Sequence, residues 1–144
     1  MCKRAAAGLL SVVILAAACS THRGNDTDAP PDLPLPAYPG AVHLGQQRVY
    51  GTDGTHITWD GFASADPPAR VVDFYRGAVA RVFEASAERF EAGEGGGGKW
   101  RFLRPGEGDV VLDVMPAGRP GPHEAFAERI PASARTIVIL SRRP

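Results

Sequence analysis

The sequence predicts a small α+β domain in which one main helix packs on an antiparallel sheet. Residues 42–63 contain two segments of alternating apolar and polar residues, as strands with one buried face do. Residues 67–83 have apolar residues at helical spacing, and further strand-like segments follow them. Two strands, one helix and then more strands is the order of an α+β fold rather than of alternating βαβ units.

The first two strands are predicted at Val42 to Tyr50 and at Thr55 to Ala63. Asp53-Gly54 between them favours a two-residue hairpin turn, because both turn positions need positive φ. With this turn, Tyr50 lies opposite Ile57 and one face of the hairpin is buried. The buried face is predicted to carry Val42, Leu44, Tyr50, Ile57, Trp59 and Ala63, and the other face His43, Val49, His56, Thr58 and Asp60.

Asp66-Pro67-Pro68 predicts the start of the helix, with Asp66 as N-cap and a proline where no backbone donor is lost. The apolar residues at helical spacing are Val71, Phe74, Tyr75, Ala78, Val79, Val82 and Phe83. A glycine inside a helix costs about 1 kcal/mol relative to alanine, so close backbone packing is expected at Gly77. We expect the helix to end near Phe83 and a strand to span residues 86–92; continuation of the helix to Ala92 is the alternative.

The C-terminal part is predicted to complete the sheet. Lys99 to Arg104 and Asp109 to Met115 are interpreted as strands joined at Pro105-Gly106. His123 to Arg129 is a candidate short helix. Thr136 to Ser141 is apolar on both faces, which indicates a central strand.

Residues 1–18 have the pattern of a signal peptide, with Lys3 and Arg4 before an uncharged run from Ala5 to Ala18. As a helix the run would span about 21 Å, less than the ~30 Å of a bilayer core, so a permanent membrane span is not expected. Leu15-Ala16-Ala17-Ala18-Cys19 resembles the lipobox of bacterial lipoproteins. The resemblance implies cleavage before Cys19 and lipidation of its thiol.

The alternative is a soluble secreted or periplasmic protein. Leu15 lies four residues before Cys19, where three is commoner in that family, and the three alanines also suit ordinary signal peptidase. An aspartate directly after the cysteine would resemble the signal that retains lipoproteins in the inner membrane. Ser20 stands at that position here, which favours the outer membrane. The predicted organisation is signal peptide 1–18, lipidated Cys19 with a disordered Pro/Asp-rich tether 19–36, and one domain 37–144.

Composition bounds the class of partner. Without residues 1–18 the chain has 126 residues, with 14 basic and 16 acidic side chains, so its formal net charge is −2. This balance does not indicate nucleic acid or an anionic membrane face as a partner. With Cys19 lipidated, no disulfide is expected.

Two short motifs give a second resemblance. Tyr38-Pro39-Gly40-Ala41 and Phe74-Tyr75 resemble those of a widespread, uncharacterised type of bacterial lipoprotein domain. The similarity covers roughly residues 37–141. It implies the same α+β order and carries no activity with it.

Two stretches come close to ligand-binding motifs, and each lacks one required residue. Gly93 to Lys99 fits the G-x-x-x-x-G-K of a phosphate loop, but Trp100 stands where a hydroxyl should hold Mg²⁺. His123 to Ala127 fits four positions of the zinc motif H-E-x-x-H, but Ala127 replaces the second ligand. We therefore expect no cofactor and no metal.

No catalytic set is predicted. His43 and His56 share a face of the predicted hairpin, about 27 Å apart, so they cannot chelate one ion. The folded part has no cysteine and no serine in a nucleophile context. We interpret four glutamates as a solvated charged face: Glu84, Glu88, Glu91 and Glu94. We interpret five aromatic residues as members of one shared core: Trp59, Phe74, Tyr75, Trp100 and Phe102.

These observations predict a lipid-anchored cell-envelope protein whose domain is a non-enzymatic interaction module at the membrane surface, with an unidentified envelope protein as partner. The alternatives are a carrier or sensor of a small apolar ligand and, less favoured, a periplasmic hydrolase. An apolar cavity lined by Tyr75 and Trp100 would favour the carrier. Two carboxylates converging in a cleft would favour the hydrolase.

Overall fold

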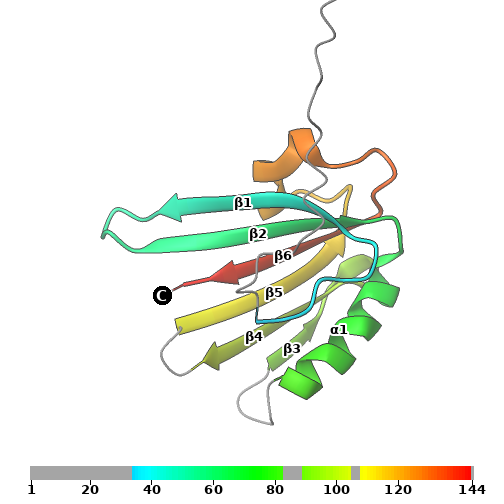
Figure 1. The fold of residues 1–144 in the computed structure, drawn as a ribbon, viewed down its shortest axis with the longest axis horizontal. Helices are drawn as coiled ribbons and strands as arrows, with labels where there is room; N and C mark the ends of the chain where they lie inside the picture. The colour runs from blue at the N-terminus through cyan, green and yellow to red at the C-terminus, as the bar shows by residue number, and fades with distance from the viewer. Residues whose placement is uncertain (1–33, 83–88, 105–107, 144) are drawn as a thin grey trace, which may run out of the picture.

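The computed structural model describes residues 34–82, 89–104 and 108–143. It is a mixed α+β fold dominated by one six-stranded antiparallel sheet in the order β1-β2-β6-β5-β4-β3. The helix α1, Pro68–Val82, lies across one face, and the 3₁₀ helix η2, Pro122–Arg129, lies on the other (Figure 1). The predicted α+β class is confirmed, although the sheet and not the helix is the larger part.

The strands lie close to their predicted positions: β1 Val42–Tyr50, β2 His56–Ser64, β3 Arg89–Ala92, β4 Gly98–Arg104, β5 Gly108–Pro116 and β6 Thr136–Arg142, with a 3₁₀ turn η1 at Glu94–Gly96. A separate strand β3 confirms that the helix does not continue to Ala92. The predicted helix end at Phe83, the Pro105-Gly106 turn, the signal segment and Cys19 lie outside the described residues. Within the described residues, no helix is long and apolar enough to cross a membrane.

The predicted register of the β1–β2 hairpin is wrong by one residue, because Tyr50 lies opposite His56. The Gly51 N–H donates to the Thr55 carbonyl over 2.7 Å, and Gly54 has a φ of 81°. This is a three-residue loop ending in a left-handed glycine, the next most common hairpin after the two-residue type.

A one-residue slip moves each side chain to the other face of a sheet. Val42 and Tyr50, predicted to be buried, are therefore exposed, and Asp60, predicted to face solvent, is completely buried. A β-bulge between His43 and Gly45 changes the register again. Beyond it Leu44 is buried, as predicted.

The first core lies between α1 and the sheet. Val71, Tyr75 and Val79 of α1 pack in one cluster with Trp100 and Leu112 of the sheet. Other members are Leu35, Tyr38, Phe62, Val72, Ala78, Phe102, Val110, Val114, Val138 and Leu140. This helix and the segment before β1 together shield one face of the sheet.

The second core lies between η2 and the opposite face, and β6 belongs to both. Val138 and Leu140 face α1, whereas Ile137 and Ile139 pack with Phe126 of η2. The prediction of a central strand buried on both faces is confirmed, since β6 lies between β2 and β5. A Cβ on Gly61 would lie 2.9 Å from the Phe126 ring, so glycine lets the ring lie directly on the strand.

The start of α1 differs from the prediction. The helix begins at Pro68, and the carbonyl of Pro67 accepts the first backbone bonds. Asp66 accepts hydrogen bonds from the Tyr38 hydroxyl at 2.7 Å and from Arg70 at 3.0 Å. The bond to Asp66, with some desolvation, raises the pKa of Tyr38. Asp66 thus anchors the N-terminal segment rather than capping the helix.

Phe74 lies at the edge of the helix–sheet contact. Its ring is half-buried and meets Tyr38 edge-on, with 5.2 Å between centroids. Phe74 thus packs at the rim of the core in which it was predicted, whereas Tyr75 is almost fully buried within it. Burial raises the pKa of the Tyr75 hydroxyl.

Gly77→Ala is expected to raise the free energy of unfolding by up to about 1 kcal/mol. Gly77 is exposed and a Cβ there would meet only Arg81, at 4.0 Å, so the close packing expected from the sequence is absent. Urea denaturation of the two chains measures the change. Gly61→Ala is the matched control and should destabilise, because Phe126 fills the space. Loss of stability in Gly77→Ala would contradict this account of the helix surface.

Candidate functional site

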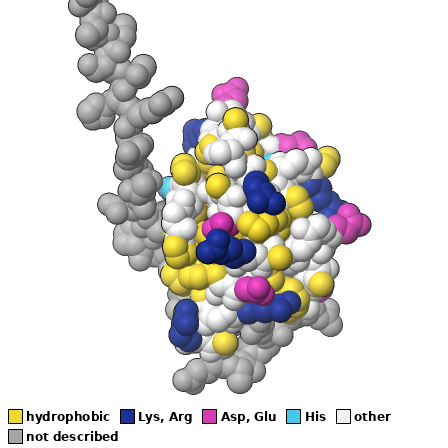
Figure 2. All heavy atoms as spheres, turned by 90° about the vertical axis from the view of Figure 1, so that its right-hand side faces the viewer, with side chains coloured by type: hydrophobic (Ala, Val, Ile, Leu, Met, Phe, Trp, Pro, Cys, Tyr) yellow, Lys and Arg dark blue, Asp and Glu magenta, His cyan; other side chains and the backbone are white. Residues whose placement is uncertain are grey.

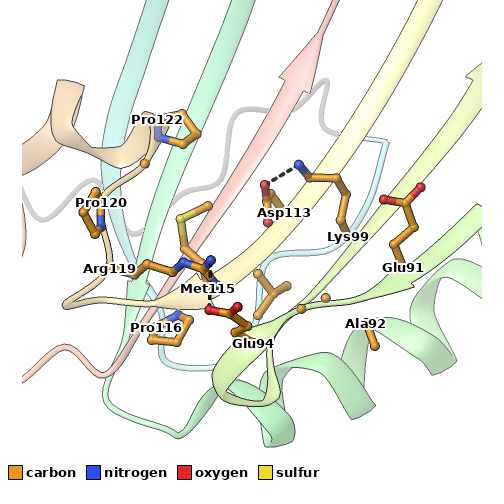
Figure 3. Close-up of a pocket in the computed structure, with 14 residues that line it drawn as sticks. Glu91, Ala92, Glu94, Lys99, Asp113, Met115, Pro116, Arg119, Pro120 and Pro122 are labelled. Atoms are coloured by element: carbon orange, nitrogen blue, oxygen red, sulfur yellow. Dashed lines mark ion pairs between the residues drawn. The ribbon is translucent and has the colours of Figure 1, made fainter.

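A surface pocket of about 270 Å³ lies where the β3–β4 turn meets the end of β5 and the loop after it (Figure 3). We call it the turn pocket. Its walls carry five charged side chains and three prolines: Glu91, Glu94, Lys99, Asp113, Arg119, Pro116, Pro120 and Pro122. Proline restricts the backbone, so one wall of the pocket is stiff.

The glycine run that resembles a phosphate loop builds the other wall. Gly95 and Gly96 have positive φ, and a Cβ on Gly97 would collide with the Val114 carbonyl. The run leads into β4 rather than into a helix, and Trp100 is completely buried in the first core. No helix N-terminus is therefore aimed at a phosphate, in agreement with the sequence analysis.

The charges of the turn pocket are paired. Lys99 Nζ lies 3.1 Å from Asp113 Oδ2, and Arg119 Nη2 lies 3.0 Å from Glu94 Oε2 (Figure 3). The strand register also places Glu91 directly opposite Lys99. The Glu94 side chain is 84 % exposed, and exposed ion pairs contribute at most about 1 kcal/mol. An incoming charged group can therefore replace Glu94 beside Arg119 at little cost.

The chemistry of the lining favours binding. The 14 lining residues include no serine, threonine, cysteine, tyrosine or histidine. The hydrolase alternative requires two carboxylates that converge in a cleft. Three carboxylates line the pocket, but Asp113 and Glu94 are each paired with a cation. The pocket thus offers charge and shape, and its lining has no hydroxyl, thiol or imidazole side chain.

A second hollow of about 230 Å³ lies on the η2 side of the sheet, toward the C-terminus. Its lining combines two apolar side chains with three charged ones and a serine: Ile57, Val111, Arg101, Asp109, Arg143 and Ser141.

The face of the molecule shown in Figure 2 carries basic and acidic side chains intermingled with apolar ones. No broad field of one sign covers that face.

The hollow between α1 and the sheet, within the described residues, is small. It is lined by Tyr75 and Leu112 among others and holds about 10 Å³. A single water needs roughly 10–15 Å³ on this measure. Of the aromatic residues predicted to share one core, Tyr75, Trp100 and Phe102 lie in the first core and Phe74 at its rim. The prediction is wrong for Trp59, which packs against the second core on the other face of the sheet.

The histidines singled out in the sequence lie apart. His123 is buried, with Nδ1 3.2 Å from Met115 Sδ. His43 stacks near Phe62, whereas His56 lies beside Tyr50 at the other end of the hairpin. The described residues contain no group of three or more His, Cys, Asp or Glu that could hold a metal ion. Of the four glutamates, Glu84 and Glu88 lie outside the described residues.

A buried charge cluster was missed in the sequence. Asp60 accepts hydrogen bonds from Arg142 Nη2 at 2.7 Å and from Gln46 Nε2 at 3.1 Å, and His43 Nε2 lies 3.9 Å away. Its side chain is fully buried, and that of Arg142 is 26 % exposed. The only local signal was an aspartate inside a strand pattern, which is equally compatible with a solvent face.

Comparison of the chain with protein-family models, with curated proteins and with solved structures found no match.

Proposed function

We propose that the chain is a lipid-anchored cell-envelope protein whose domain is a non-enzymatic interaction module, and that a partner protein docks in the turn pocket. The observation that carries this proposal is the lining of the pocket, which has ion pairs and stiff walls but no hydroxyl, thiol or imidazole side chain. A partner segment with both charge signs suits such a site, because it can replace Glu94 at Arg119 and Lys99 at Asp113.

The anchor is proposed from the sequence. Cys19 follows a signal-like segment and precedes a Pro/Asp-rich stretch that would reach about 50 Å if extended. Two or three acyl chains exceed the two signals that stable anchoring needs, and the outer membrane is the proposed site. Tethering raises the effective concentration of the domain near other envelope proteins. The carrier alternative gains no support from an interior hollow of about 10 Å³.

The test places a photo-reactive benzophenone side chain at Arg119 in the full chain, expressed in a bacterial envelope. Irradiation should give a covalent adduct with an envelope protein in the membrane fraction. Arg81, exposed on α1, is the matched control position and should give none. In the Cys19→Ala background the protein should stay uncleaved or leave the membrane fraction. Equal adducts at both positions would contradict the pocket. Unchanged membrane partition together with an unmodified mass of the N-terminus would contradict the anchor.

A further inference from the structure

The two outer edges of the sheet differ in how well they are protected. Edge strands expose unpaired backbone groups, and proteins shield them by short length and charged residues. The strand β3 has four residues, two of them charged, Arg89 and Glu91. The strand β1 has nine residues and one permanent charge, Arg48. The β1 edge is therefore the one open to another strand.

The apolar surface of the described residues is concentrated on this same strand. The exposed large hydrophobic side chains are Val42, Val49 and Tyr50, with 48 %, 41 % and 68 % of their surface exposed. Pairing of β2 with β6 starts at Thr58, so the end of the hairpin projects past β6 (Figure 1). Val49 and Tyr50 lie on this projecting end, where another chain can reach them.

The hydrogen bonding of the hairpin fixes which backbone groups are free. In an antiparallel pair, residues alternate between bonding toward the partner and pointing away from it. The bond from Gly51 N–H to the Thr55 carbonyl sets the alternation. It directs the backbone groups of Val49 toward β2 and those of Arg48 and Tyr50 toward the free edge.

We propose that β1 pairs antiparallel with β1 of a second copy of this chain, about a two-fold axis at Val49. The outward N–H and C=O groups of Arg48 then hydrogen-bond to those of Tyr50 in the second copy. By symmetry, the groups of Tyr50 in the first copy bond to those of Arg48 in the second. Each guanidinium lies beside a tyrosine ring, a favourable cation–π arrangement, and no like charges face each other. The two Val49 side chains meet on the axis, so these exposed apolar side chains cover one another.

A two-fold axis at Gln47 fits less well. It would bring Val49 of the second copy opposite Gly45, where the Arg129 guanidinium already occupies the space of a Cβ. Arg129 is held there by donating to the Leu44 carbonyl over 2.9 Å. The bulge between His43 and Gly45 also interrupts the edge. Pairing is thus restricted to the hairpin end.

The turn pocket lies between β3, β4 and β5, so the dimer does not rest on the proposed function.

Cysteine scanning on the full chain tests the axis. On a two-fold axis, the Cα atoms of a non-hydrogen-bonded pair are about 4.5 Å apart, which suits a disulfide. Val49→Cys should therefore give a disulfide-linked dimer under mild oxidation. Gln47→Cys, at a half-buried position of the same strand, is the matched control, because its two copies would be about 14 Å apart. The unaltered chain gives the background from its own two cysteines, Cys2 and Cys19. Equal linkage at Gln47, or none above background at Val49, overturns the proposal.

Charge substitution tests the same axis without a covalent bond. Val49→Lys and Val49→Glu each place two like charges opposite one another and should weaken self-association about fivefold or more, measured by analytical ultracentrifugation. An equal mixture of the two variants should recover association, because opposite charges then meet. Both substitutions are on an exposed residue, and unchanged thermal midpoints verify folding. Association that is unaffected in both variants, or a mixture that stays monomeric, overturns the proposal.

Discussion

Arg142→Met is expected to lower the free energy of unfolding by about 3 kcal/mol, because it leaves Asp60 as a buried carboxylate without its cation. Asp60 is fully buried, and its contact to Arg142 Nη2 is 2.7 Å. The Gln46 amide would remain as a partner at 3.1 Å, but a neutral donor does not balance the charge. Urea denaturation of the full chain at neutral pH measures the loss.

A double substitution separates the pair from its surroundings. Asp60→Leu with Arg142→Met removes both charges, and it should recover much of the stability lost in the single variants. Asp73→Ala is the matched control, since Asp73 is 75 % exposed and lies 3.9 Å from Arg76. Its effect should stay within about 0.5 kcal/mol. Single variants as mild as this control would show that the buried pair contributes little.

Phe126→Ala is expected to cost about 3–5 kcal/mol, the range for a fully buried phenylalanine. The ring is 1 % exposed and lies so close to Gly61 that a Cβ added there would be 2.9 Å from it. A short 3₁₀ helix has little stability of its own, so η2 depends on this ring to stay on the sheet. Its detachment would also uncover Ile137 and Ile139 of the second core.

The same denaturation experiment applies to Phe126, and binding of a hydrophobic dye reports exposure of the second core. Glu128→Ala is the control on η2, because Glu128 is exposed, and should change stability by less than about 0.5 kcal/mol. Phe74→Ala, at a half-buried ring, should cost less than Phe126→Ala. A loss at Phe126 no larger than at Phe74 would mean that η2 is held by other contacts.

The predictions that succeeded depended on signals within one segment. Ile137 to Leu140 are consecutive apolar residues, and they form a strand buried on both faces. The helical spacing from Val71 to Val79 likewise predicted α1, and the predicted start at Pro67 lies one residue from the observed start at Pro68. Such patterns report the surroundings of a segment directly, because burial repeats with the period of the element.

The errors arose where distant residues decide the outcome. Asp53-Gly54 suits a two-residue turn and also the loop that forms, so local turn chemistry left the register open by one residue. Burial of Asp60 depends on Arg142, 82 residues away in the sequence. The ion pair of Glu94 and Arg119 likewise joins segments that only the sheet brings together. Neither partner carries a local signal for the other.

The position of β6 has a consequence for when the protein can fold. Among the described elements this strand comes last in the sequence, yet it lies between β2 and β5. The segments before it can form the β1–β2 hairpin and the β3–β4–β5 meander, but only β6 joins them into one sheet. Both cores take side chains from Ile137 to Leu140, so neither core is complete before β6 has entered the sheet. Folding of the domain therefore depends on pairing between segments that are distant in the sequence, and such pairing is slower than the formation of local hairpins.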